Sequence, residues 1–137
     1  MNWQNKMEKL TRNNLSLLVE KNGEVLYTSE APRLKPLFAC ILEQGDAMQE
    51  SLVIDKVIGR AAALLCVYAG VSAVVTPLAS ETAKSVLAEH NIPLYADKVT
   101  PRILNQEQTD LCPMEKMSLN FDSPEAFFNH LSGVIQI

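Results

Sequence analysis

The residues best suited to chemistry lie at a junction inside an apolar segment, "SLVIDKVIGRAAALL", residues 51–65. Asp55 and Lys56 interrupt this run, and Gly59 and Arg60 follow them. Charged groups in a buried segment are unfavourable unless they are paired or used. A helix that starts here offers free N–H groups to an anion, Lys56 and Arg60 add positive charge, and Gly59 permits close approach to the backbone. We therefore predict one wall of a ligand site. The alternative is a solvated rim with Arg60 in an ordinary ion pair.

A second candidate for chemistry is "DLCPME", residues 110–115. The Cys112 thiol is a candidate nucleophile, and Glu115 is a candidate base or ligand-orienting carboxylate. Pro113 disfavours helical geometry at Cys112, which places the thiol on an extended segment. The alternative is an inert cysteine, because most cysteines behave as small hydrophobic residues and no histidine lies nearby in the sequence.

Four further polar residues are weaker candidates for ligand binding. Ser80 precedes a predicted helix, and Glu81 lies in its first turn, where a negative charge favours the helix dipole. Helix capping alone also explains this pair and is the interpretation that we favour. Arg102 and Asn105 are possible hydrogen-bonding partners for a polar ligand, and as plain surface residues they would be equally ordinary.

The clearest structural signal is a hairpin over residues 15–30. Asn22-Gly23 favours the positive φ angles of a type I′ turn. In that register Val19 faces Leu26, and Leu18 faces Tyr27.

Alternating helix and strand patterns follow the hairpin. We predict helices at 33–44, 57–70 and 81–90 and from 124 onward, and strands at 51–54, 71–77 and 92–97, with Pro77 ending the second of these strands. Helical crossovers make this a three-layer α/β/α sandwich with a mixed sheet, mostly parallel after the hairpin. The helix starts at 55–60 and 78–82 then lie at the carboxyl edge of the sheet, where ligands bind in such folds.

The remaining segments complete a predicted single domain, residues 1–137. Residues 98–120 lack clear periodicity, and connections this long are often functional. We expect this long loop to cover the site. Residues 123–137 form a C-terminal helix and tail, with Ser123 as its cap.

Composition narrows the possible partners and compartment. The 137 residues are 47% hydrophobic and 20% charged, with a formal net charge of −4 and no basic stripe, so nucleic acid is not an expected partner. Three cysteines without a C-x-x-C pair or a signal sequence indicate a reduced, cytoplasmic protein. The uncharged stretch between Arg60 and Glu81 is broken by Gly70 and Pro77, so we expect no membrane span. Two isolated histidines give no metal site.

Three motifs, "DKVIGRAAALL", "SETA" and "RILN…CPME", are similar to those of an uncharacterised prokaryotic family with the cytidine deaminase-like fold. The resemblance covers roughly residues 10–118. It implies the α/β/α sandwich, with a cleft at the two helix starts where true deaminases hold zinc. Those enzymes carry H-x-E and P-C-x-x-C motifs. This chain has neither, so the resemblance implies no zinc, no other cofactor and no zinc-dependent deamination.

Two functions remain open from the sequence. The first is a cleft for a polar or anionic small molecule, such as a nucleotide-like metabolite, in a binding protein or a metal-free enzyme. Lys56 would be the electrostatic anchor or proton donor, Arg60 the anion clamp, Glu115 a hydrogen-bond acceptor, and Cys112 a reactive group. The second is a non-catalytic interaction module with a vestigial cleft, in which exposed apolar surface at the hairpin edge or on "EAFFNHL" mediates homo-oligomers or partner binding.

Overall fold

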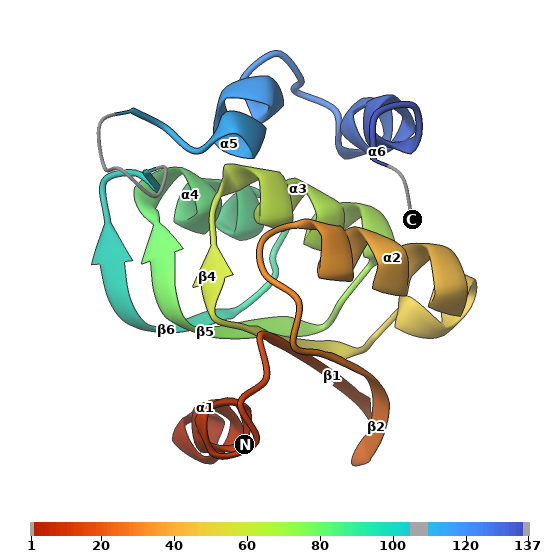
Figure 1. The fold of residues 1–137 in the computed structure, drawn as a ribbon, viewed down its shortest axis with the longest axis vertical. Helices are drawn as coiled ribbons and strands as arrows, with labels where there is room; N and C mark the ends of the chain where they lie inside the picture. The colour runs from red at the N-terminus through yellow and green to blue at the C-terminus, as the bar shows by residue number, and fades with distance from the viewer. Residues whose placement is uncertain (1, 105–109, 136–137) are drawn as a thin grey trace.

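The protein is built around one mixed β-sheet with helices on both faces (Figure 1). The computed structural model describes residues 2–104 and 110–135. The strands are β1 (Leu17–Lys21), β2 (Glu24–Ser29), β3 (Leu52–Asp55), β4 (Val57–Ile58), β5 (Ala73–Ser80) and β6 (Leu94–Thr100). β1 pairs antiparallel with β2 and β3, whereas β3, β4 and β6 all pair parallel with β5. The predicted α/β class and mixed, mostly parallel sheet are confirmed.

The helices are distributed unequally over the sheet. α2 (Lys35–Gln44), α3 (Arg60–Ala69) and α4 (Glu81–Glu89) cover one face, and α1 (Trp3–Arg12) lies on the other (Figure 1). α5 (Pro113–Ser118) and α6 (Pro124–Ser132) pack outside α3, and a short 3₁₀ helix, η1 (Gly45–Met48), follows α2. None of the helices within the described ranges has the length and apolar character needed to cross a bilayer.

The N-terminal hairpin has the predicted turn but a different register. Asn22 and Gly23 both have positive φ, at 53° and 82°. A bulge follows, in which Leu26 has no partner, so Val19 lies opposite Tyr27 rather than Leu26. The expected pairs beyond the turn were therefore wrong by one residue. The turn residues fix where a hairpin starts, but an extra residue further along the strand leaves no signal in them.

β5 does not end at Pro77, as the sequence predicted, but continues to Ser80. Proline has no N–H to donate, and the pairing on β5 skips Pro77 on both sides. Thr76 compensates because its Oγ1 accepts a hydrogen bond from the Leu78 N–H at 3.2 Å. β5 is therefore one strand with an internal irregularity.

The same irregularity places the charged junction. Ile54 pairs with Val75 and Val57 pairs with Leu78, so β3 and β4 keep one register and are separated only by Asp55 and Lys56 at the junction. These two residues lie alongside Thr76 and Pro77, where the parallel ladder is interrupted. Residues 57–58, expected to begin a helix, continue the strand, and α3 begins at Arg60. The sheet thus projects Asp55 at an interruption in its ladder.

α1 was not predicted, and a buried ion pair explains its position. Glu20 is only 3% exposed, and its carboxylate accepts hydrogen bonds from Lys6 Nζ at 2.6 Å and Lys9 Nζ at 2.9 Å. Leu10 adds an apolar contact to the sheet face formed by Leu18, Ile54 and Val75. The helix is held by tertiary contacts that its own polar sequence does not reveal.

Candidate functional site

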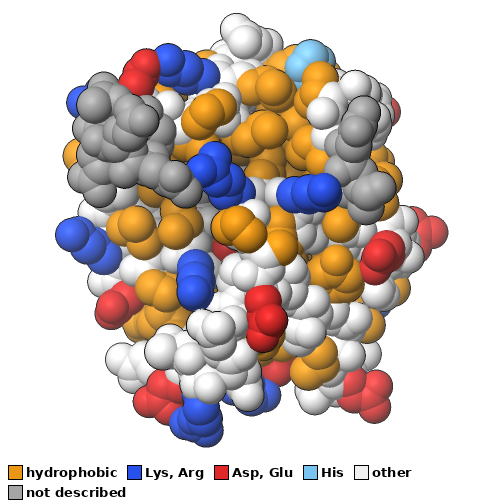
Figure 2. All heavy atoms as spheres, in the orientation of Figure 1, with side chains coloured by type: hydrophobic (Ala, Val, Ile, Leu, Met, Phe, Trp, Pro, Cys, Tyr) orange, Lys and Arg blue, Asp and Glu red, His pale blue; other side chains and the backbone are white. Residues whose placement is uncertain are grey.

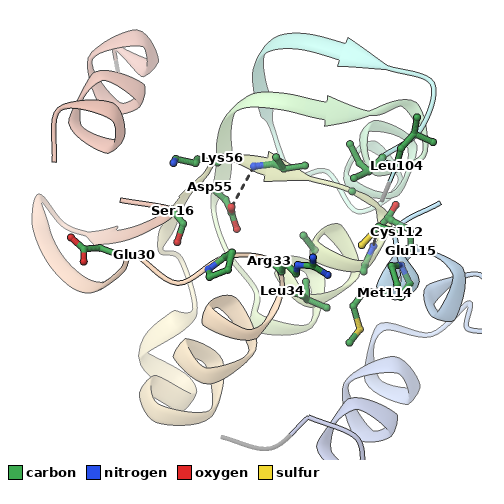
Figure 3. A pocket seen from close by; sticks show the side chains of 17 residues that line it. Ser16, Glu30, Arg33, Leu34, Asp55, Lys56, Leu104, Cys112, Met114 and Glu115 are labelled. Carbon is green, nitrogen blue, oxygen red and sulfur yellow. Dashed lines mark hydrogen bonds between the residues drawn. The ribbon is translucent and has the colours of Figure 1, made fainter. Parts of the chain in front are cut away.

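A cavity of about 400 Å³ opens where β3 ends and α3 begins (Figure 3). Its wall is formed by Ser16, the loop 30–34, the junction 55–59, the start of α3, and residues 103–104 and 112–115. Most of the lining is apolar, with a few polar groups, which is the usual character of a small-molecule pocket. We call this cavity the Asp55 pocket.

Asp55 is one of two buried carboxyl groups in the described wall of this pocket, and the other is Glu115. The Asp55 side chain points into the cavity (Figure 3), and the residue is 9% exposed. Its Oδ1 accepts one long hydrogen bond from the Val57 N–H, at 3.4 Å. Burial raises the pKa of the Asp55 carboxyl to about 7, although the N–H groups of Val57 and Lys56 oppose this effect. The carboxyl therefore changes charge near neutral pH.

Two basic residues of the pocket are exposed, namely Lys56 and Arg33. Within the described parts of the chain, neither side chain forms an ion pair. The Lys56 side chain points away from Cys112 and Glu115 (Figure 3). Arg33 has φ of 72°, a left-handed conformation that is uncommon for a residue other than glycine. Sequence reasoning missed Arg33 because residues 30–34 reach the pocket only through the hairpin pairing.

Glu115 is fixed at the start of α3. Its Oε2 accepts a hydrogen bond from Arg60 N and its Oε1 from Ala61 N, both at 2.9 Å. Gly59 makes this approach possible, since a Cβ on Gly59 would lie 2.5 Å from the Glu115 carboxylate. A carboxylate at a helix N-terminus is favoured by the free N–H groups and the dipole. The predicted anion site at this helix start thus holds a carboxylate from the protein itself.

The Arg60 side chain is turned away from the Asp55 pocket. Its guanidinium donates hydrogen bonds to the carbonyl oxygens of Ser118 and Phe121, the second at 2.8 Å. It also lies 3.8 Å from the Asp122 carboxylate. Arg60 is therefore not one of the residues that line the pocket, and its side chain instead holds the segment between α5 and α6.

Cys112 lies in the pocket wall beside Glu115 (Figure 3). Its backbone is extended, with φ −53° and ψ 139°, as the following proline predicted. Its N–H donates to the Ile103 carbonyl at 3.1 Å, and Leu104 forms a bridge with Leu111. These contacts hold both segments of the predicted loop against the pocket. Cys112 is partly exposed, whereas Cys40 and Cys66 are buried.

The other predicted site residues do not line the Asp55 pocket within the described structure. Ser80 is buried and caps α4, its Oγ accepting from Ala83 N at 3.0 Å. Glu81 is exposed in the first turn of α4, as expected for a dipole-favoured acid. Arg102 is exposed, and Asn105 lies outside the described residues.

The described residues do not fit the zinc centre that deaminase folds can hold. Within residues 2–104 and 110–135, no three His, Cys, Asp or Glu side chains are grouped to hold a metal ion. At the start of α4 the cap is a serine hydroxyl that already bonds to the backbone. Zinc sites need several nitrogen, sulfur or carboxylate donors in one shell.

These features define an α/β protein whose fold is similar to part of the RibD structure. In the Acinetobacter baumannii RibD structure the match has a TM-score of 0.52 at 11% identity, covering 95% of this chain and 39% of that one. The family model described as "TM1506: Domain of unknown function (DUF1893)" matches residues 5–135, so the chain belongs to the DUF1893 family. The crystal structure of the DUF1893 family protein TM1506 from Thermotoga maritima matches with a TM-score of 0.86 at 26% identity, covering 96% of this chain and 88% of that one. A search of curated proteins finds no match.

Proposed function

We propose that the protein binds a polar small molecule in the Asp55 pocket, with an anionic group of the ligand, as in a nucleotide-like metabolite, near Arg33 and Lys56. The observation that carries the proposal is the Asp55 carboxyl, which is buried, aimed into a cavity and held by one long hydrogen bond. A buried polar group without good partners is unfavourable by itself. A ligand that satisfies Asp55 would remove that penalty.

The position of the anionic group follows from how the other charges are used. Glu115 already satisfies the first N–H groups of α3, and the Arg60 guanidinium already bonds to backbone carbonyls. Arg33 and Lys56 make no ion pair in the described structure. We therefore propose that Arg33 and Lys56, rather than Arg60, bind the negatively charged group of the ligand.

Binding can be tested with a panel of anionic and nucleotide-like metabolites by thermal stabilisation, followed by calorimetry on each hit. The Arg33→Ala and Lys56→Ala variants should weaken binding of a hit, whereas Lys84→Ala, a matched change on the exposed surface of α4, should not. The absence of any stabilising compound, or hits whose affinity neither pocket variant changes, would overturn the proposal.

Cys112 provides an independent readout of occupancy. It is the partly exposed cysteine of the three, so iodoacetamide added to the folded protein should alkylate it first. A ligand in the pocket should slow that alkylation, whereas a compound bound elsewhere should leave the rate unchanged. If a substrate is converted, Cys112→Ser separates reaction at the thiol from binding alone.

Self-association is a second proposal, supported by exposed apolar residues on the helical side. Leu42 and Tyr68 are 49% and 40% exposed, and Tyr68 stacks on Phe128 of α6 with ring centroids 4.1 Å apart. Figure 2 shows hydrophobic side chains gathered over the part of the molecule where α3, α5 and α6 lie. Light scattering of the wild type and of Leu42→Lys tests this proposal, and a monomer at high concentration would contradict it.

A further inference from the structure

We infer that the ligand of the Asp55 pocket carries two separated charged groups, a cationic hydrogen-bond donor against Asp55 and an anion against Arg33 and Lys56. This inference rests on the proposed function and specifies its ligand class. Amidinium or guanidinium compounds that also carry a carboxylate or phosphate fit this description.

The donor end follows from what Asp55 lacks. A carboxylate has two oxygens and about four lone-pair sites, and the described structure supplies one hydrogen bond, at 3.4 Å from Val57 N, whereas the nearby Lys56 N–H donates to the Ser16 carbonyl at 3.1 Å. Bidentate pairing with an amidinium or guanidinium would satisfy both oxygens in one plane. The burial of Asp55 strengthens such a pair, because fewer water molecules compete with it.

The groups that face Asp55 leave this role to a ligand. Just before β1, Ser16 uses its hydroxyl proton for backbone carbonyls, and in β5, Thr76 Oγ1 bonds to Leu78. From α3, Cys66 is buried, and the negative charge of Asp55 adds to the burial that raises its pKa. No cationic side chain of the described residues contributes to the pKa of Asp55.

The other charged residues that line the pocket also form no ion pair with Asp55 in the described structure. Glu30 is exposed at the opening, and Glu115 is fixed on the backbone of α3. Neither Arg33 nor Lys56 lies within 4.0 Å of a described carboxylate, so no described acid neutralises either positive charge by direct pairing. A ligand with a single negative charge would satisfy the basic residues and leave Asp55 with only the long hydrogen bond from the Val57 N–H.

Protonation of Asp55 gives the inference a signature that does not depend on mutation. A cation binds the ionised carboxylate, and the carboxyl is largely protonated below its pKa of about 7. Binding should therefore release a proton, and affinity should rise about tenfold between pH 6 and pH 8. An anionic ligand that avoids Asp55 would show neither effect.

The test uses three probes of similar size on the 137-residue chain, namely benzamidine, benzoate and 4-amidinobenzoate, with calorimetry in buffers of different ionisation enthalpy. We expect 4-amidinobenzoate to bind most tightly and benzoate least, with proton release for both amidines. Asp55→Asn, which preserves side-chain size, should lower amidine affinity at least tenfold. Arg33→Ala should weaken 4-amidinobenzoate and benzoate but leave benzamidine unchanged, whereas Lys84→Ala should change nothing.

The outcomes separate this inference from the proposed function. Benzoate binding as tightly as the amidines, or amidine binding without proton release, would overturn the two-charge ligand and leave a small-molecule pocket. The same conclusion holds if no amidine binds while an anionic metabolite from the panel does. If neither the probes nor the panel bind, the proposed function itself fails.

Discussion

Gly59 and Glu115 depend on each other although 56 positions separate them in the chain. A methyl group on Gly59 would lie 2.5 Å from the Glu115 carboxylate, which cannot stay bound to the first N–H groups of α3. Gly59 has φ of −95°, so alanine is compatible with its backbone. We expect Gly59→Ala to lower the free energy of unfolding by about 2–3 kcal/mol, measured by urea denaturation, because charge-assisted hydrogen bonds are lost.

A double-mutant cycle distinguishes this clash from a general defect at Gly59. Glu115→Ala alone should lower the free energy of unfolding by a similar amount, since it leaves buried N–H groups without an acceptor. In the Glu115→Ala protein, Gly59→Ala should have little further effect. Two fully additive losses would show that the residues act independently and would contradict the capping interaction.

The sequence identified these site residues better than it identified their partners. It selected Gly59 as a point of close approach, and the group that approaches is the protein's own Glu115. It assigned Arg60 to an anion, whereas the guanidinium bonds to two carbonyls of the α5–α6 segment. Residue type shows what a side chain can do, but the partner is decided by tertiary distances that one sequence does not encode locally.

At the scale of elements, Arg60 joins α3 to the segment that follows α5. Replacement by methionine keeps an apolar stem but removes the hydrogen bonds to Ser118 and Phe121. We expect Arg60→Met to raise hydrogen exchange in residues 118–122 and to lower the free energy of unfolding by about 1–3 kcal/mol. Arg12→Met, which breaks an exposed pair with Glu8, should change neither quantity measurably. Unchanged exchange in residues 118–122 would show that other contacts hold this segment.

The docking of α1 gives a second prediction at this scale. Glu20→Gln removes the charge that binds Lys6 and Lys9 but retains the size of the side chain. We expect faster hydrogen exchange throughout α1 and a loss of about 1–3 kcal/mol, a moderate value because both lysines are partly exposed. Glu8→Gln, an exposed change on α1, is the control. Equal exchange in the two variants would mean that apolar contacts alone hold the helix.

The elements that the sequence predicted are those with strong local signals. The hairpin, α2, α3, α4 and α6 were predicted from a turn dipeptide, apolar periodicity and caps, and Ser123 indeed caps α6 through Ala126 N at 3.2 Å. α1, β4, α5 and the bulge were missed. α1 depends on a buried ion pair, β4 has two residues, α5 has six, and the bulge follows from strand pairing. These features arise from contacts between distant segments.

At the scale of the whole molecule, the sheet topology determined where a pocket forms. Parallel strands flanked by helices place their carboxyl ends at one edge, so the location of the pocket beside Asp55 follows from the order of elements. The hairpin and the chain before α5 then supply opposite walls. The charge arrangement inside the pocket does not follow from topology, because Arg33 enters through a loop with an uncommon backbone conformation.

The buried Asp55 carboxyl should set how the stability of the whole protein depends on pH. Its pKa is raised from 3.8 to about 7 by burial, so the folded protein holds this proton at pH values where the unfolded chain has lost it. The contribution of this bound proton to the free energy of unfolding is complete below pH 3.8 and is lost as pH rises to about 7. The difference between the two pKa values corresponds to at most about 4 kcal/mol.

We therefore expect the free energy of unfolding of the wild type to fall between pH 5 and pH 8, by about 2–3 kcal/mol, in urea denaturation without ligand. Asp55→Asn is nearly isosteric and does not titrate, so its stability should change less over this range and should exceed that of the wild type at pH 8. The comparison with Asp55→Asn cancels the contributions of the other titrating groups. Glu20, whose pKa is lowered in the folded protein, changes the free energy of unfolding only at pH values below its usual pKa of 4.5. Parallel pH curves for the two proteins would show that Asp55 is solvated, and both the raised pKa and the need for a ligand cation would then lose their support.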